Sequence, residues 1–197
     1  MLEHNAPTNE PPLEPPSQTA KSVRAGIWNA LSWVRDLAFS VLIAVILIVF
    51  IYQPVKVEGT SMMPTLVDNE RIFINKFTYH FGLGDIARGD MVVFWFPLDK
   101  DKSYIKRVIG LPGDSVRIDA GQVYVNGQAL DESYVPEECR DRVSWEEHTV
   151  PKGQYFVLGD HRNSSSDSRT WGYVKRDAIY GKAVFVYWPL DKMGRLR

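Results

Sequence analysis

The chain has 197 residues, 45% of them hydrophobic, and its formal net charge is −1. This length suits one domain with a hydrophobic core and excludes two large ones. The near-neutral charge excludes a general attraction to polyanions, and because no local basic patch is present either, we expect no binding to nucleic acid. The single cysteine, Cys139, cannot form an internal disulfide and lies in no Cys/His ligand set, so we expect no metal and no cofactor.

The N-terminal part of the chain predicts a tail and a membrane anchor. Residues 1–24 begin with a stretch rich in Pro, Glu, Asn and Thr, which has too few apolar side chains to offset the entropy of ordering, so we predict a disordered tail. Residues 37–52 (LAFSVLIAVILIVFIY) are uncharged, and apolar residues before them extend the run across Arg35 to the roughly 20 residues that a spanning helix needs.

The alternatives for this run are a cleaved signal peptide and a buried core helix. No small-x-small cleavage site follows the run, and the run has no polar face. We therefore predict an uncleaved, single-pass anchor over residues 25–53. Lys21, Arg24 and Arg35 precede it closely and Lys56 follows it. The positive-inside rule then places the N-terminus in the cytoplasm and residues 54–197 outside the plasma membrane or, alternatively, the thylakoid membrane.

Beyond the anchor, the sequence changes to short β-branched and aromatic runs separated by Gly, Pro and Asp. The runs cover residues 70–76, 91–96, 103–110, 115–118, 122–130, 154–159 and 182–188. Hairpin turns are predicted at residues 119–121 and at Asn126-Gly127, a dipeptide that tolerates positive φ. No helical pattern of comparable length follows, so residues 54–197 are predicted to form a mainly β, antiparallel domain.

Three polar segments stand out in this β-rich part. Ser61 lies in VEGTSMMPTL, directly after the anchor, and Lys106 lies in YIKRVIGLPGD, inside a predicted strand. Residues 159–172 (GDHRNSSSDSRTWG) form a loop crowded with charges, which suits a hydrogen-bonded cage beside a site. Each segment alone has an ordinary structural explanation. Strand alternation puts Lys106 and Arg107 on opposite faces but does not decide which charge is buried.

Taken together, the segments SMMPTL, KRVIGLPGD and GDHRNSSSDSR, in this order behind an N-terminal anchor, resemble the conserved boxes of bacterial type I signal peptidases. The resemblance covers roughly residues 30 to 190. It implies a membrane-bound serine endopeptidase with a Ser–Lys dyad on a β-fold. Such an enzyme removes N-terminal signal peptides from exported preproteins after small residues of the Ala-x-Ala kind, on the outer face of the membrane.

The resemblance also implies roles for individual residues. Ser61 is the expected nucleophile and Lys106 the expected general base. Ser165 is expected to orient the lysine by a hydrogen bond, and Asp167 with Arg169 to form a supporting ion pair.

Four further residues are expected near the substrate. Met62 and Pro64 would shape the nucleophile's turn, and Tyr104 and Ile105 would border the substrate cleft. The substrate is expected to bind in an extended conformation and to add a strand to the sheet. The expected partners are preprotein signal peptides and the lipid bilayer. The oligomeric state is left open, with a monomer expected.

The oxyanion hole is where this sequence departs from some family members. They carry a serine two residues before the nucleophile, whereas this chain has Gly59. Either a backbone N–H takes the place of that hydroxyl, with Ser61 and Gly59 as the expected oxyanion donors, or the enzyme works with a reduced oxyanion hole; we expect the first. The four histidines match no catalytic position of the family: His4, His80, His148 and His161.

Two other classes of protein remain as alternatives. Self-cleaving repressor-type proteins also use a Ser–Lys pair, but they carry a DNA-binding head where this chain has an apolar run. A catalytically silent, membrane-anchored binding protein would present the same β-domain to exported chains. Cleavage of a preprotein in trans would exclude both.

Overall fold

The structure is a computed structural model that describes residues 32–46, 52–76 and 84–196. The chain divides into two units, with the boundary between residues 46 and 47. In the first unit, residues 32–46 form a helix whose side chains are exposed along almost its whole length. The predicted tail (1–24) and two parts of the predicted anchor (25–31 and 47–51) lie outside the described residues.

The described part of the chain contains no helix with both the length and the apolar character needed to cross a bilayer. β1 begins at Tyr52, two residues before the predicted start of the outer domain at residue 54.

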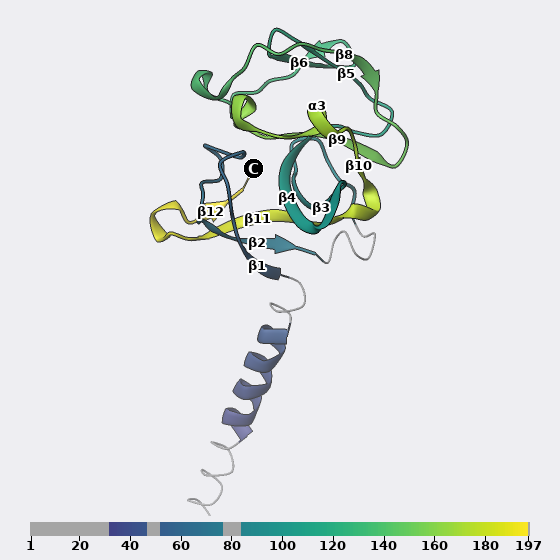
Figure 1. Ribbon diagram of the computed structural model, residues 1–197. Coiled ribbons are helices and arrows are strands. Elements are labelled where there is room, and N and C mark those ends of the chain that lie inside the picture. The colour runs from purple at the N-terminus through teal and green to yellow at the C-terminus, as the bar shows by residue number, and fades with distance from the viewer. Residues whose placement is uncertain (1–31, 47–51, 77–83, 197) are drawn as a thin grey trace, which may run out of the picture. The chain divides into compact units, whose positions relative to one another are not determined.

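The second unit is built from two antiparallel sheets (Figure 1). The strands of the larger sheet run, in spatial order, β1 (Tyr52–Lys56), β2 (Arg71–Asn75), β11 (Ile179–Trp188), β3 (Met91–Phe96), β4 (Asp99–Gly110), β9 (Gln154–Leu158) and β10 (Val174–Lys175), with β12 (Gly194–Arg195) paired to β11. The smaller sheet runs β7 (Gln128–Ala129), β6 (Gln122–Val125), β5 (Ser115–Asp119) and β8 (Trp145–Thr149). The predicted mainly β, antiparallel fold is confirmed.

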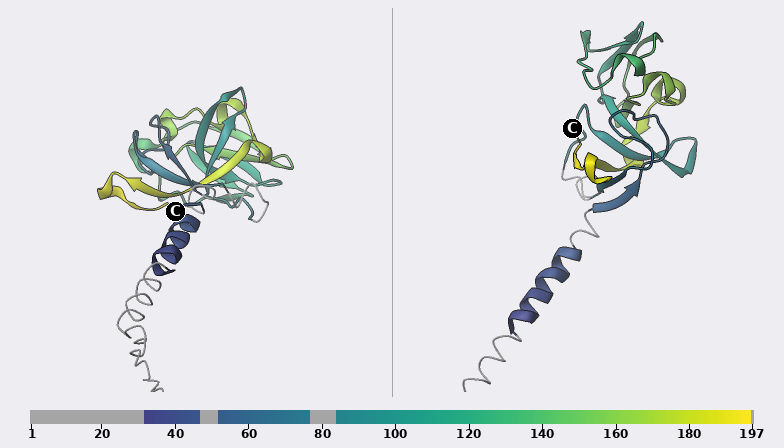
Figure 2. Two further views of the ribbon diagram at one scale, coloured as in Figure 1. Left: turned by 90° about the horizontal axis from the view of Figure 1, so that it is seen from below. Right: turned by 90° about the vertical axis from the view of Figure 1, so that its left-hand side faces the viewer.

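Short helical turns complete this unit. They are η1 (Glu137–Cys139), η2 (Arg162–Ser164), α3 (Ser168–Trp171), η3 (Arg176–Ala178) and η4 (Leu190–Lys192). β5, β6 and β8 lie at one end of the unit and β1, β2 and β11 at the other, with β3 and β4 between them (Figure 1). Two further views show that the strands of the larger sheet curve strongly, as right-handed twist requires (Figure 2).

Burial along the strands follows their position. β3 lies between β11 and β4, and its first four residues are all buried, so its sequence MVVF is apolar on both faces. β5 and β6 instead alternate half-buried and buried residues, because only one face of the small sheet is covered. Their predicted turns form as expected: Ala120 and Gly121 have positive φ, as do Asn126 and Gly127.

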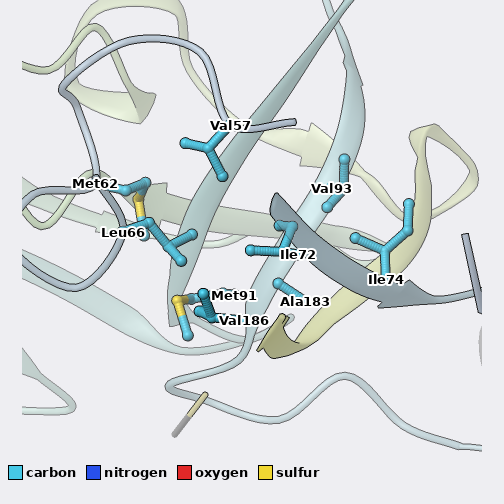
Figure 3. Close-up of a cluster of buried hydrophobic side chains, with 9 residues drawn as sticks. All are labelled: Val57, Met62, Leu66, Ile72, Ile74, Met91, Val93, Ala183 and Val186. Carbon is cyan, nitrogen blue, oxygen red and sulfur yellow. The ribbon is translucent and has the colours of Figure 1, made fainter. Parts of the chain in front are cut away.

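One core cluster joins the larger sheet to the loop that carries Ser61. Figure 3 shows Val57, Met62 and Leu66 from that loop beside side chains of the strands. The strand members are Ile72, Ile74, Met91, Val93, Ala183 and Val186. All nine side chains are at most 4% exposed. The nucleophile's loop is therefore fixed by hydrophobic burial directly after the predicted serine.

Candidate active site

Ser61 begins a turn between β1 and β2, and backbone hydrogen bonds hold the chain on both sides of it. Val57 N–H donates to Glu70 O at 2.8 Å and Leu66 N–H donates to Met62 O at 2.9 Å. Met62, only 1% exposed, fills the core directly below. The burial of Met62, the next residue, leaves the Ser61 hydroxyl little freedom to move away from its hydrogen-bond partner.

Lys106 is that partner: its Nζ donates to Ser61 Oγ at 2.5 Å. The lysine lies on β4, where it pairs with Val92 of β3. β9 pairs with β4 only from Arg107 onward, so the backbone of Lys106 lies where the ladder on that side ends. The structure thus brings together two predicted residues that are 45 positions apart in the sequence.

The environment of Lys106 favours its neutral form. The residue is 3% exposed, and the ion pairs formed among the described residues do not include it. Burial lowers the pKa of Lys106 to about 8, although the charges of Asp167 and Asp160 raise it in part and Arg169 lowers it further. A lysine in this state loses its proton far more easily than an ordinary lysine, which is what a general base requires.

The polar loop of residues 159–169 lies behind the Ser61–Lys106 pair. Asp167 is fully buried, and its two carboxylate oxygens accept from Arg169 Nε and Nη2, both at 2.8 Å. The same carboxylate accepts from Gly159 N–H at 3.1 Å. A Cβ added to Gly159 would come within 2.4 Å of Ser61 O and 2.2 Å of Ser165 Oγ. The loop therefore reaches Ser61 through a position where only glycine fits.

Ser165 is placed close to the site but not as its expected role requires. Its hydroxyl is buried and has no hydrogen-bond partner among the described residues, so the expected bond to Lys106 is not formed in this structure. Catalytic hydrogen bonds are often open in proteins without substrate and close only in the complex. The orienting role of Ser165 stays a prediction.

A cleft of about 670 Å³ opens in front of Ser61 and Lys106. Tyr104 and Ile105, which were expected to border the substrate, are among the residues that line it. Met62 and Pro64 are not among the residues that line it: Met62 lies in the core and Pro64 is exposed at the surface of the turn. The cleft is also lined by residues for which no role had been expected, namely Val55, Val57, Ile72, Val93 and Tyr180. They belong to separate strands and loops, so only the fold brings them together.

The two expected oxyanion donors differ in the structure. Gly59 N–H already donates to Asp68 Oδ1 at 2.8 Å, with Gly59 at φ 94°. Among the described residues, Ser61 N–H has no acceptor. The Ser61 amide thus has no acceptor within the described residues, whereas the Gly59 amide would first have to leave Asp68 to donate to another group.

His161 contacts the nucleophile's turn, which the sequence reasoning missed. Its backbone N–H donates to Ser61 O at 3.1 Å, and its Nδ1 lies 3.2 Å from Thr60 O. The signal was its place inside the charged loop, between Asp160 and Arg162. His148 lies exposed on β8, and His4 and His80 lie outside the described residues. Over the described ranges, no group of three or more His, Cys, Asp or Glu side chains is placed to hold a metal ion.

Comparisons with known proteins show which proteins this chain is similar to. The family model described as "Signal peptidase, peptidase S26" matches residues 30–188. A signal peptidase I of Leptolyngbya laminosa is 36% identical over 98% of this chain and 96% of its own length. The probable signal peptidase I-2 of Synechocystis is 40% identical over 91% of this chain and 82% of its own length. A solved signal peptidase I of Enterococcus faecalis is 34% identical, with a TM-score of 0.44 over 50% of this chain and 97% of that one.

Proposed function

This chain belongs to the signal peptidase family, peptidase S26, and is a serine peptidase that removes signal peptides from preproteins; from that premise we propose that Ser61 and Lys106 are its catalytic dyad. The observation that carries the proposal is the 2.5 Å contact between Lys106 Nζ and Ser61 Oγ, with the lysine buried. Among the described residues, no carboxylate competes for the lysine at ion-pair distance.

In the proposed mechanism, neutral Lys106 takes the proton of the Ser61 hydroxyl while Oγ attacks the scissile carbonyl carbon. The Ser61 N–H donates to the oxyanion that forms on the carbonyl oxygen. The Lys106 ammonium then gives its proton to the leaving amine, which departs as the new N-terminus and leaves an ester on Ser61. A water, deprotonated by Lys106, hydrolyses this ester and regenerates the hydroxyl.

The cleft supports binding of an extended substrate. β1 pairs only with β2 among the described strands, and the first half of β4 pairs only with β3. Both walls of the cleft therefore offer unpaired backbone groups to an added strand. The apolar wall of valines and Ile72 suits the small side chains of an Ala-x-Ala site. We propose that this cleft holds the residues before the scissile bond.

We also propose the membrane arrangement that the sequence predicts: an anchor over residues 25–53, a cytoplasmic N-terminus and an extracytoplasmic unit after it. The uncharged run of residues 37–52 and the preceding positive charges support it. A tether would raise the effective concentration of the protease at the emerging cleavage site without new contacts. Protease added to intact spheroplasts should then degrade only the part after about residue 53.

The test of the proposed dyad is cleavage in trans. Detergent-solubilised full-length protein is incubated with a preprotein, and the product's new N-terminus is sequenced. We expect trimming after the small-x-small site by the wild type and none by Ser61→Ala or Lys106→Ala. Activity in Ser61→Ala would show that the nucleophile is another residue.

A further inference from the structure

The connection between β7 and β8 lies against the catalytic loop. We call residues 131–142, which include η1, the strap. η1 lies next to η2 of the polar loop (Figure 1), and Asn163 Nδ2 donates to Glu138 O at 2.9 Å. The strap belongs to the small sheet, so it joins that sheet to the site on the larger one.

Three strap side chains each contact a different arginine of the site. Glu132 Oε1 accepts from Arg162 Nη2 at 2.5 Å. The Tyr134 ring centroid lies 4.1 Å from the Cζ of Arg107. Asp141 Oδ2 accepts from Arg169 Nη1.

Each of these arginines continues toward the dyad. Arg162 Nε donates at 3.0 Å to the carbonyl of Gly159, the residue packed against Ser61. Arg169 holds both oxygens of Asp167, whose charge acts directly on Lys106. Through Arg162 the strap reaches the residue packed against Ser61, and through Arg169 it reaches the carboxylate whose charge acts on Lys106.

Arg107, the third arginine, follows Lys106 in β4. It forms two hydrogen bonds with Asp160, at 2.8 and 2.7 Å, and donates to Gly89 O at 2.9 Å. Tyr134 covers its open face, which is the geometry of a cation–π contact. The strap thus contacts the strand that carries the base, at the residue next to Lys106.

The burial of these contacts argues against a packing role alone. Glu132 and Arg162 have side chains that are 1% and 3% exposed, and ions removed from water cost several kcal/mol each. Apolar side chains would fill the same space at lower cost. Charged pairs, unlike apolar contacts, fix direction as well as distance, because each hydrogen bond has a required geometry.

We propose that Glu132 and Asp141 are positioning residues for signal-peptide cleavage: through Arg162 and Arg169 they hold the polar loop in the one geometry that aligns Ser61 with Lys106. The inference rests on the proposed dyad. It assigns a role in the reaction to the small sheet, which contributes no side chain that touches Ser61 or Lys106 among the described contacts.

The test compares two matched aspartates of the strap. Asp131 and Asp141 both accept a backbone N–H two residues on, from Ser133 and Val143, at 3.1 Å, but only Asp141 also binds an arginine. Asn retains the turn in both. In full-length protein, Asp141→Asn should lower kcat roughly 10- to 100-fold with little change in KM, since small misplacements of catalytic groups cost this much. Asp131→Asn should match the wild type.

The pH profile separates positioning from simple loss of stability. The charges that act on Lys106 are Asp167, Asp160 and Arg169, and Arg169 lowers its pKa. Without the charge of Asp141, less negative charge offsets Arg169, so the limb on which kcat rises with pH should move to lower pH in Asp141→Asn. Glu132→Gln should lower kcat in the same range, whereas Glu137→Gln, with a side chain 92% exposed, should not.

All rates are corrected for the folded fraction, measured by near-ultraviolet circular dichroism. Asp141→Glu, which keeps the charge, should recover part of the lost kcat. An unchanged kcat in Asp141→Asn, or a lower kcat with an unmoved limb, would overturn the proposal. Ser61→Ala is run in the same assay: if it still cleaves, the dyad is wrong, whereas if it is inactive and Asp141→Asn is normal, only the strap's role is wrong.

Discussion

The two faces of β4 hold buried cations in opposite situations. Lys106 and Arg107 are neighbours and are 3% and 2% exposed, yet Arg107 is paired with a fully buried carboxylate and Lys106 faces a serine hydroxyl. Arg107 has a counter-ion, and this pair holds the two side chains in a fixed arrangement. Among the described residues Lys106 has no ion-pair partner, and the cost of its burial appears as a lowered pKa. The same degree of burial thus accompanies an ion pair at Arg107 and a lowered pKa at Lys106.

The largest expected effect is on the cleavage rate, and it tests Lys106. Lys106→Arg keeps a cation of similar reach, but a guanidinium does not lose its proton in proteins. We expect cleavage to fall as far as in Lys106→Ala, roughly 10²- to 10⁴-fold, the usual contribution of a general base. Single-turnover cleavage of a preprotein measures it. Substantial activity would break the comparison and direct the search for a base to His161, beside the nucleophile's turn.

Replacing Arg107, on the other face of β4, should lower the free energy of unfolding. Arg107→Met leaves the buried Asp160 without its partner, which typically costs about 3–5 kcal/mol of unfolding free energy. Denaturant unfolding measures the loss. The double variant Arg107→Met with Asp160→Leu removes both charges and should recover much of it. Equal losses in the single and double variants would mean that the ion pair is not what matters there.

For Lys106 we expect the opposite effect: its replacement should raise the free energy of unfolding. The folded pKa of Lys106 is about 8, against 10.5 for an ordinary lysine, so the folded state holds the proton less tightly than the unfolded chain. Below pH 8 both states are protonated and the full cost, on the order of 3 kcal/mol, is present; it disappears as pH rises through 10.5. Lys106→Met should therefore be inactive but more stable than the wild type, and more so at pH 6.5 than at pH 10. A gain that does not depend on pH would contradict the depressed pKa.

The smallest effect concerns the orienting serine. Ser165→Ala removes a hydroxyl that lacks a partner in the structure, so the melting temperature should barely move. If the hydroxyl binds Lys106 during the reaction, the rate should fall roughly two- to twelvefold, the value of one hydrogen bond. Ser168→Ala, in the same loop, is the contrasting control: its Oγ accepts from the buried Val157 N–H, so its loss should lower stability by about 1–3 kcal/mol. An unchanged rate in Ser165→Ala would remove Ser165 from the site.

Parts of this arrangement could be predicted from the sequence. The strands with β-branched runs and the turns at 119–121 and Asn126-Gly127 follow from local chemistry, and the structure contains all of them. The short strands β10 and β12 were missed, because their two residues pair only through the fold. β8, with the sequence WEEHT, was missed since most of its side chains are exposed and show no apolar alternation.

Site residues could be predicted where the local sequence around them is distinctive. Contacts between residues far apart in the sequence could not be predicted. Ser61 and Lys106 were marked by their segments. Alternation could not say which of Lys106 and Arg107 is buried, because β4 is covered on both faces at that point and both are. The contacts of the strap could not be predicted for a similar reason. Glu132 and Arg162 are 30 residues apart, and the sequence around either one does not indicate that they pair.

The lowered pKa of Lys106 also makes the proposed reaction depend on the pH of the medium that reaches the site. With a pKa of about 8, about one molecule in eleven has a neutral base at pH 7, and this fraction falls about tenfold for each further unit of acidity. In the proposed topology, the base meets the medium on the far side of the membrane. Maturation of exported proteins would then slow whenever proton pumping acidifies that side, which links the processing rate to the energisation of the membrane.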